Sequence, residues 1–347
     1  MRGFLFILAL AAALAGWAQD PGVIPMRCTV LPLPADRPQG IATWINNSGL
    51  ITGCFFTDHR DRWADSRACY WKNGVFNRLP SPTSLATVAV GASANSILVE
   101  AYLGGGIPYS AYLCRGDKIT VVTDPADGAV TIDAKAINNR NQVVGGYQTA
   151  AGHQHAFVWQ YGKFVDLGTL GGNDSCAYGI NDRGQVVGRS KLATGEWRAF
   201  LWDGKQMINL GTYEGGDSCA TAINNRGVIV GNAGQWDEEY QAYYSSSCVW
   251  VDGVINGLGH LGGKGSTCMA INNHNLIVGY SDSVEQSDFC CLYNTEQLIQ
   301  YQIVPWELDV QPYSRGTGIN DRGQMVGHTA DCSVFTEVAV PLLWEPE

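Results

Sequence analysis

The chain has 347 residues, a formal net charge of −10 and only 16% charged residues, with 42 Gly, 15 Tyr and 11 Trp. A composition so rich in glycine and aromatic residues favours an all-β protein over a helical one. The acidic surface repels phosphate backbones and anionic lipid, and no segment after the N-terminal region is apolar for long enough to span a bilayer. We therefore expect no nucleic-acid partner and no membrane insertion.

Residues 1–18 have the layout of a cleaved secretory signal. Arg2 precedes an apolar run from Phe4 to Leu14, and the small residues Gly16 and Ala18 follow it. We expect cleavage after Ala18. Residues 19–347 would then form a single exported domain, periplasmic or extracellular, which we expect to be a monomer.

All of the 11 cysteines lie after the signal, and they form no CxxC or Cys/His metal pattern. Their odd number means that at least one thiol stays free or pairs between chains. Many occupy repeat positions that other copies fill with Ala or Phe, which favours small buried hydrophobic residues over disulfides. The best local candidate for a disulfide is Cys54 with Cys69, which we place on adjacent strands.

An Ile-Asn pair recurs along the whole chain, with its isoleucine at Ile45, Ile137, Ile180, Ile223, Ile271 and Ile319. The copies are 43 to 48 residues apart except for one gap of 92, whose middle holds a decayed copy around Ser93. Seven units at this period predict a propeller or a solenoid.

The repeated stretch "GINDRGQVVG", at Gly179 to Gly188, predicts a tight hairpin whose fourth turn residue has a left-handed backbone conformation. The copies place only glycine or asparagine there: Gly49, Asn141, Gly184, Gly227, Asn275 and Gly323. These two residue types adopt positive φ at the lowest cost. The motif therefore predicts turn geometry rather than a chemical site.

The rest of each unit reads as strands. Two small residues separated by one position precede the Ile-Asn pair, which predicts a strand with one crowded face near a common axis; Trp44 breaks this rule in the first copy. A β-branched pair follows the turn, and then come a third strand such as "HAFVW" (155–159) and a fourth such as "FVDLGTLGG" (164–172). Each unit thus predicts one four-stranded blade.

The two ends of the chain discriminate between a closed ring and an open array. The last unit stops after its third strand at Val340 to Glu345, whereas Arg27 to Pro34 matches a fourth strand without a unit of its own. We therefore predict an all-β, seven-bladed β-propeller with four strands per blade, closed by residues 27–34 docking on the last blade. A β-helix is the alternative. The unit around residues 81–133 is the weakest, and its strand number stays open.

The stretches "AINNRNQVVGGY" (136–147) and "GHQHAFVWQYGKFVDLGTLGG" (152–172) resemble the bacterial extracellular HAF-repeat proteins, whose His-Ala-Phe triplet lies here at His155 to Phe157. The resemblance covers essentially the whole mature chain and implies an exported repeat protein, with no established activity to carry over. Arg198, Ser246 and Phe289 stand where other repeats would have the histidine, so that histidine is not a shared site. A short Asn-x-x-Gly-Gln run also resembles the regulator of chromosome condensation family, but an acidic exported chain argues against a nuclear role.

No catalytic constellation stands out. The sequence has no Gly-x-Ser-x-Gly elbow, no P-loop and no Rossmann fingerprint. His153 and His155 could hold a metal on one face of a strand, but no third ligand lies nearby in sequence, so packing or hydrogen bonding is the favoured role. We predict no catalytic residue, metal or cofactor.

The predicted ligand-binding residues lie in loops that a propeller presents on one face. Asp174 and Asp217 follow Gly-Gly in equivalent fourth-to-first strand connections, where they either form Asx turns or ring one mouth of the channel. The aromatic residues come from two long second-to-third strand loops: Trp63, Trp236, Tyr240 and Tyr243. Such rings suit glycan stacking or a protein interface, unless they fold down over the blades.

These observations lead to two functional hypotheses. In the first, the protein is a binding or scaffold module that engages a glycan or an extracellular protein through this loop-rich face. In the second, it is a propeller enzyme, a glycoside hydrolase or lyase, acting on extracellular polysaccharide. Two carboxylates roughly 5 to 9.5 Å apart at a concave centre would favour hydrolysis.

Overall fold

The structure is a computed structural model that describes residues 26–57, 65–103, 107–123, 131–212, 215–237, 242–259, 262–283, 288–294, 299–303, 314–329 and 339–346. The expected signal segment, residues 1–18, lies outside these ranges. The described residues form the strands β1 to β28. No helix among them is long and apolar enough to cross a bilayer.

Six sheets each contain four strands that are consecutive in the chain, and we name them blades 1 to 6. Blades 1 to 3 comprise β2 (Gln39–Ile45), β3 (Ile51–Phe56), β4 (Arg67–Lys72) and β5 (Val75–Arg78); β6 (Ala86–Ala92), β7 (Ile97–Leu103), β8 (Ile107–Arg115) and β9 (Lys118–Val122); and β10 (Ile132–Ile137), β11 (Val143–Gln148), β12 (Gln154–Gln160) and β13 (Lys163–Asp166). Blades 4 to 6 comprise β14 (Gly171–Ile180), β15 (Val186–Leu192), β16 (Trp197–Trp202) and β17 (Met207–Asn209); β18 (Asp217–Ile223), β19 (Ile229–Asp237), β20 (Ala242–Val251) and β21 (Val254–Gly259); and β22 (Gly262–Ile271), β23 (Leu276–Ser283), β24 (Asp288–Asn294) and β25 (Ile299–Ile303).

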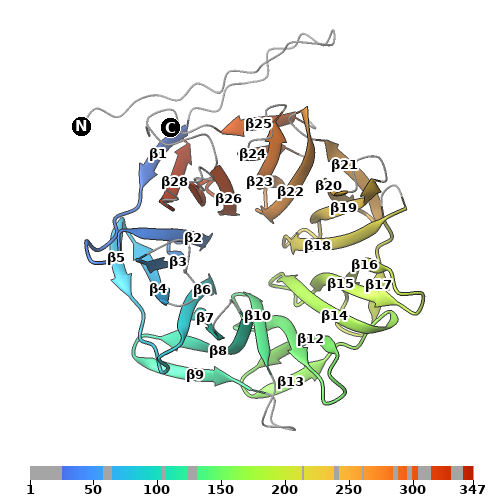
Figure 1. Ribbon diagram of the computed structural model, residues 1–347, viewed down its shortest axis with the longest axis horizontal. Coiled ribbons are helices and arrows are strands. Elements are labelled where there is room, and N and C mark those ends of the chain that lie inside the picture. The colour runs from blue at the N-terminus through green and yellow to red at the C-terminus, as the bar shows by residue number, and fades with distance from the viewer. Residues whose placement is uncertain are drawn as a thin grey trace.

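A further sheet, blade 7, joins the two ends of the chain. It contains β26 (Ser314–Ile319), β27 (Met325–Thr329), β28 (Pro341–Pro346) and the N-terminal β1 (Met26–Val30). β1 pairs antiparallel with β28, from Met26 opposite Pro346 to Val30 opposite Leu342. The sheets stand around a common axis as a propeller, with the first strand of each innermost (Figure 1). The predicted all-β propeller and its closure by the N-terminal strand are confirmed.

The weak unit around residues 81–133 also forms a complete sheet. Blade 2 pairs β6 to β9 in the same antiparallel order as the other blades. Its first turn, residues 93–96, is one residue shorter than the equivalent turn at 181–185 in blade 4. Blade 2 therefore keeps its four paired strands although its repeat motif is largely lost.

The left-handed turn residues are confirmed. The backbone φ is +86° at Gly184 and +92° at Gly227, and it is +57° at Asn141 and +62° at Asn275. In blade 4 the Gly184 N–H donates to the Asn181 carbonyl oxygen at 3.0 Å, which closes the turn. Either glycine or asparagine occupies this position because both residue types tolerate a positive φ.

The innermost strands contain a feature that the sequence analysis missed. In each of the seven sheets the register shifts between two equivalent residues of the first strand, as between Ala177 and Gly179 in blade 4. Both residues are small in every blade except blade 1, where they are Ala42 and Trp44. The residue between them is a β-bulge and leaves the ladder. The bulge residues are Thr43, Val90, Lys135, Tyr178, Thr221, Met269 and Thr317.

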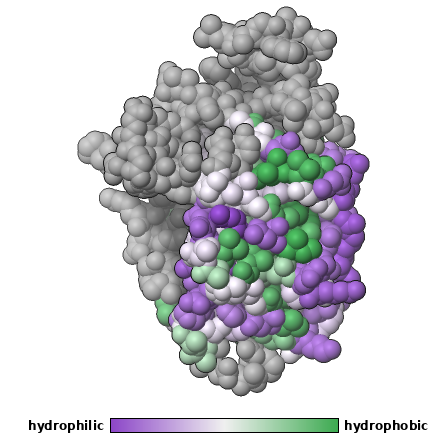
Figure 2. Space-filling view, turned by 90° about the vertical axis from the view of Figure 1, so that its right-hand side faces the viewer, coloured by the Kyte–Doolittle hydropathy of each residue, from purple (hydrophilic) through white to green (hydrophobic). Residues whose placement is uncertain are grey.

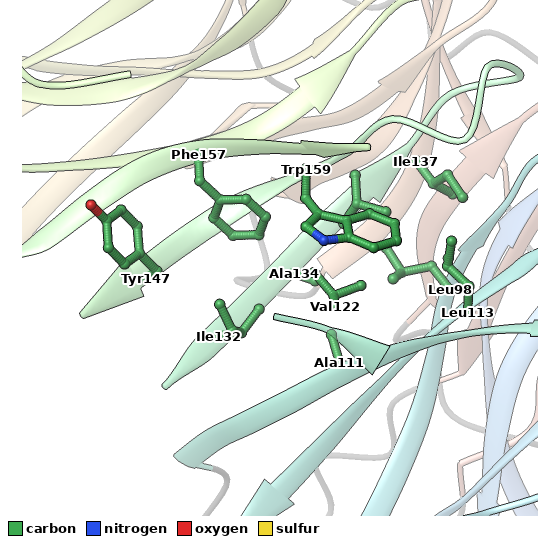
Figure 3. Packing of buried hydrophobic residues seen from close by; sticks show 11 residues of the cluster. Leu98, Ala111, Leu113, Val122, Ile132, Ala134, Ile137, Tyr147, Phe157 and Trp159 are labelled. Atoms are coloured by element: carbon green, nitrogen blue, oxygen red, sulfur yellow. The ribbon is translucent and has the colours of Figure 1, made fainter. Parts of the chain in front are cut away.

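The core lies between neighbouring blades. Figure 3 shows Phe157 and Trp159 of β12 packed with Leu113 and Val122 of the preceding blade. Equivalent tryptophans on third strands, Trp71, Trp250 and Trp344, are also at most 1% exposed. On the side of the molecule in Figure 2, hydrophilic and hydrophobic residues intermingle. Fourth strands expose single apolar side chains such as Ile208 and Val254.

Six cysteines of the described residues are buried: Cys54, Cys69, Cys114, Cys176, Cys248 and Cys268. Cys54 and Cys69 are 1% and 0% exposed and Cys69 is a free thiol, so the disulfide considered for this pair does not form. Cys69 lies opposite Gly53 in the β3–β4 register, and Cys54 lies opposite Ala68. Burial raises the pKa of Cys114 to about 11 and that of Cys268 to about 12, which keeps these thiols protonated.

Candidate binding site at one mouth of the central channel

The asparagine of each Ile-Asn pair links its blade to the next one. The Nδ2 of Asn138 donates to the backbone oxygen of Asn181 at 2.9 Å, and Asn181 donates in the same way to Asn224 at 3.0 Å. The series continues through Asn272 and Asn320 back to Asn46 and on to Ser93. These residues, the asparagine ladder, thus hydrogen-bond around the ring.

Each ladder asparagine also shapes its own turn. The Oδ1 of Asn181 accepts the backbone N–H groups of Arg183 and Gln185, both at 3.0 Å, and Asn181 itself is 3% exposed. A buried amide that satisfies several backbone groups at once is costly to replace. The Ile-Asn repeat therefore encodes both a turn and a blade-to-blade contact.

The residues that follow the ladder form a second ring, which we call the amide belt: Asn47, Asn139, Asp182, Asn225, Asn273 and Asp321. Neighbours in the belt bond twice, except Asn225 and Asn273, which share one hydrogen bond. The Asn139 N–H donates to Oδ1 of Asp182 at 2.9 Å, and the Asn225 Nδ2 donates to Oδ2 of the same carboxylate at 2.9 Å. Asp321 receives equivalent bonds from Asn273 and Asn47.

The belt carboxylate of Asp182 is held in the ionised form. Burial alone raises the pKa of Asp182, but hydrogen bonds from Asn225 and Asn139 outweigh it and lower the pKa below its ordinary value. Asp321 is separated from Asp182 along the belt by Asn225 and Asn273. A general acid must hold a proton near neutral pH, so Asp182 does not suit that role.

The belt is interrupted in blade 2, where Ala94 occupies the equivalent position. Trp44 lies at the same boundary between blades 1 and 2. It is half-buried and packs against the cluster of Ala92, Ile97 and Cys114. The other blades have small residues at the position of Trp44. At the equivalent position in blade 7, a Cβ added to Gly318 would lie only 3.1 Å from the Cα of Trp44. The ring is therefore asymmetric at one boundary.

A cavity of 540 Å³ occupies this end of the channel. It is lined by the bulge residues of the innermost strands, including Lys135 and Tyr178, by the amide belt, and by every ladder asparagine except Asn320. Trp44 and Ala94 also line it. The cavity thus has an amide-rich mouth with one apolar, aromatic break.

Asp174, predicted from the sequence as a ligand residue, joins two blades, and its role in binding stays a prediction. Its Oδ1 accepts the backbone N–H of Gln154 in blade 3 at 3.2 Å, and its Oδ2 accepts Nζ of Lys191 at 2.8 Å. The hydrogen bond from Lys191 lowers the pKa of this carboxyl group. The adjacent Ser175 Oγ accepts the Ala156 N–H and donates to the Gly168 carbonyl oxygen.

Asp217 repeats this arrangement one blade on. Its Oδ1 accepts the backbone N–H of Trp197 at 3.0 Å, and Arg198 lies 4.0 Å away. Ser218 bonds to Ala199 and Gly211 as Ser175 does to its partners. Both carboxylates thus bond to the third strand of the preceding blade rather than form the expected Asx turns, and these contacts between blades account for the recurrence of the Asp-Ser pairs. Neither carboxylate lines the cavity, and a ligand role for Asp217 also stays a prediction.

The predicted aromatic ligand residues lie largely beyond what the structure describes. Trp63 and Tyr240 fall outside the described residues. The backbones of Trp236 and Tyr243 pair across β19 and β20. Their role in binding stays a prediction.

The other ionisable groups of the described residues do not assemble a catalytic or metal centre. His155 Nδ1 lies 2.9 Å from Asp166, whereas His153 Nδ1 lies 3.8 Å from Asp174, so the two histidines contact different carboxylates. No group of three or more possible metal ligands occurs in the described part of the chain. The described contacts therefore do not bring the two histidines together as ligands of one metal ion.

A buried charged cluster lies between blades 2 and 3. Glu100 is fully buried and accepts the Tyr102 hydroxyl, while Lys135 pairs with Asp133. Burial raises the pKa of Glu100 well above its ordinary value, and nearby Asp133 adds to this effect. Glu100 does not line the cavity, so its proton is held behind the channel wall.

The sequence analysis missed the amide belt, although the sequence carries a signal for it. The position after the Ile-Asn pair is always Asn or Asp except in the decayed copy. A turn alone does not demand these residues in every copy. The recurrence of Asn or Asp at this position was attributed to the hairpin turn alone.

Comparison with solved structures reveals only the fold. The β-propeller domain of the Trilobed protease from Pyrococcus furiosus, described as having an open velcro topology, is 9% identical, with a TM-score of 0.58 over 90% of this chain and 95% of that one. A puromycin hydrolase S511A mutant complexed with PGG is 11% identical, with a TM-score of 0.55 over 84% of this chain. The Pyrococcus horikoshii acylaminoacyl peptidase is 10% identical, with a TM-score of 0.54 over 90% of this chain.

This chain spans about half the length of the two enzymes, 50% and 52%. No family model matches the chain, and no protein with a curated description is detectably similar to it in sequence. At identities this low the shared feature is the propeller fold.

Proposed function

We propose that this protein is an exported binding module without chemistry of its own, and that it engages a glycan at the mouth of the central channel. The observation that carries the proposal is the break in the amide belt, where Trp44 lines the cavity beside Ala94. An aromatic face flanked by amide groups suits a sugar ring and its hydroxyl groups. Tyr178 supplies a second aromatic lining residue.

Binding accounts for this site better than hydrolysis does. The amide belt places two carboxylates at the mouth, but both accept several N–H groups and Asp182 has a lowered pKa. Glycoside hydrolysis needs one carboxyl group that stays protonated beside the substrate. Glu100 has the raised pKa but is fully buried and does not line the cavity.

Glycan-array screening of the purified full-length mature protein, followed by calorimetry on the hits, tests this proposal. Replacing Trp44 by phenylalanine keeps an apolar ring in the blade 1–2 contact but removes part of the stacking face, so we expect about fivefold weaker binding. Trp202→Phe is the matched control, because Trp202 is a half-buried third-strand tryptophan that does not line the cavity. Its affinity should match that of the unsubstituted protein.

The same experiment separates the competing hypotheses. Binding that depends on Trp63 and not on Trp44 would move the site to the loop-rich face predicted from the sequence. Release of reducing sugar from any bound polysaccharide would replace the binding module by the propeller enzyme. No bound glycan at all would remove carbohydrate recognition.

A further inference from the structure

A ring of positively charged side chains surrounds the amide belt. In five blades the exposed residue that follows the belt residue is a cation or a histidine: Arg140, Arg183, Arg226, His274 and Arg322. Blade 1 has Ser48 at this position. The cations therefore recur with the blades and lie just outside the cavity rim.

The arginine side chains are placed by the neighbouring blade. The Nη2 of Arg140 lies 2.8 Å from the point that a Cβ on Gly184 would occupy, and Arg183 and Arg322 stand likewise at Gly227 and Gly49, at 3.0 and 2.5 Å. Each guanidinium group thus lies over the next turn, in space that a side chain would otherwise fill. A partly ordered arginine loses less entropy when it binds a ligand.

These guanidinium groups keep their charge available. None of the four rim arginines forms an ion pair within the part of the chain that the structure describes. The nearest belt carboxylates, Asp182 and Asp321, already accept hydrogen bonds from belt asparagines. Arg140 acts on Asp182 and Arg322 on Glu345 only through space, and the four rim arginines outnumber the two belt carboxylates. The channel mouth therefore has an excess of positive charge although the chain as a whole has a net charge of −10.

We infer that the ligand of the channel mouth is an acidic glycan, a chain of uronate residues; this inference rests on the proposed function. Guanidinium groups match carboxylates in a two-pronged geometry, and they prefer them to neutral hydroxyl groups. The amide belt and Trp44 would contact the hydroxyl groups and a ring face. Inside the cavity, Lys135 is paired with Asp133, so the selectivity for the acid resides in the arginine rim.

A matched pair of ligands tests the charge directly. We would measure calorimetric affinities of the full-length mature protein for an oligogalacturonate and for its fully methyl-esterified form, which has the same length and no charge. The oligogalacturonate should bind roughly tenfold more tightly than its ester, and added salt should weaken the binding of the oligogalacturonate only. Arg140→Gln combined with Arg322→Gln should remove this preference while leaving the affinity for the ester within about twofold.

Lys205→Gln is the control variant, because Lys205 is an exposed cation in the outer turn of blade 4 and its contact with Asp203 is made by its backbone. It should retain the preference for the acid. Equal binding of acid and ester, with dependence on Trp44, overturns the acidic-glycan inference and leaves the proposed function in place. Binding of neither oligosaccharide, nor of any arrayed glycan, removes both. Tighter binding of duplex DNA than of the oligogalacturonate, lost in the double arginine variant, overturns the inference in favour of nucleic acid.

Discussion

Blade 4 retains the repeat motif in full, whereas blade 2 has lost most of it, yet both form four antiparallel strands with a bulge at the same place. Blade 4 has Asn181, Asp182 and Gly184 in its first turn, and blade 2 has Ser93 and Ala94 in a shorter one. Ser93 Oγ accepts the Ser96 N–H at 3.1 Å, as a ladder asparagine accepts turn N–H groups. The sheet itself thus needs little of the motif, and the motif serves contacts between blades.

The regular blade 3 and the decayed blade 2 also differ in the size of the side chain that their third strands bury. Trp159 of blade 3 is 2% exposed, and Cys114 is the equivalent residue in blade 2. Trp159→Ala should lower the free energy of unfolding by about 3–5 kcal/mol, because it opens a large cavity. Cys114→Ala should cost only about 1 kcal/mol. Urea unfolding monitored by circular dichroism compares the two, and equal losses would mean that blade 2 packs as tightly as its neighbours.

The asparagine ladder should contribute more in blade 4 than in blade 2. Asn181→Ala removes bonds to Asn224, Gln185 and two turn N–H groups and leaves buried backbone groups unsatisfied. We expect a loss of about 2–4 kcal/mol, against about 1 kcal/mol for Ser93→Ala. Denaturant midpoints at constant m-value measure both. A Ser93→Ala loss as large as that of Asn181→Ala would contradict a ladder centred on the regular blades.

The boundary between blades 2 and 3 should make stability depend on pH in its own way. Burial raises the pKa of Glu100 above its unfolded value, so its protonated form stabilises the fold at low pH, and this contribution is lost as the pH rises through the folded-state pKa. Asp133, Lys135 and Tyr102 are the charged or titratable groups that act on it. Glu100→Gln should therefore gain stability relative to the unsubstituted chain with rising pH, by at most about 1.4 kcal/mol per pH unit.

Unfolding free energies of both proteins across the acidic and neutral range provide that difference. Asp182, whose pKa is lowered, changes stability in the opposite direction and cancels in the comparison because it is present in both chains. A difference independent of pH would show that folding does not raise the pKa of Glu100.

The smallest expected change closes the amide belt. Ala94→Asn places an amide between Asn47 and Asn139 at an exposed position and should add about 0.5–1 kcal/mol of stability. The same side chain would cover the break beside Trp44, so glycan affinity should fall while stability rises. Calorimetry and urea unfolding on one preparation measure both. An unchanged affinity would place the ligand elsewhere.

The sequence could predict features that depend on neighbouring residues or on the two ends of the chain. The left-handed turns at Gly184 and Asn141 follow from φ preferences within a few residues, and the closure by β1 follows from a missing fourth strand. The amide belt arises from contacts such as that of Asn139 with Asp182, which lie in different blades and meet only when the sheets surround one axis. The bulge at Tyr178 was missed because strict strand alternation conceals an extra residue.

The bond from Arg27 to Glu345 spans 318 positions, so the ring is completed by a contact between the most distant described parts of the chain. Blades 1 to 6 can assemble from neighbours as the polypeptide emerges, but blade 7 must wait for residues near both ends. A circular permutant that carries β1 after β28 would make every blade contiguous in the chain. Such a protein should refold faster to the same final architecture. Its unfolding rate, compared with that of the original chain, would measure how much the pairing of β1 with β28 stabilises the closed ring.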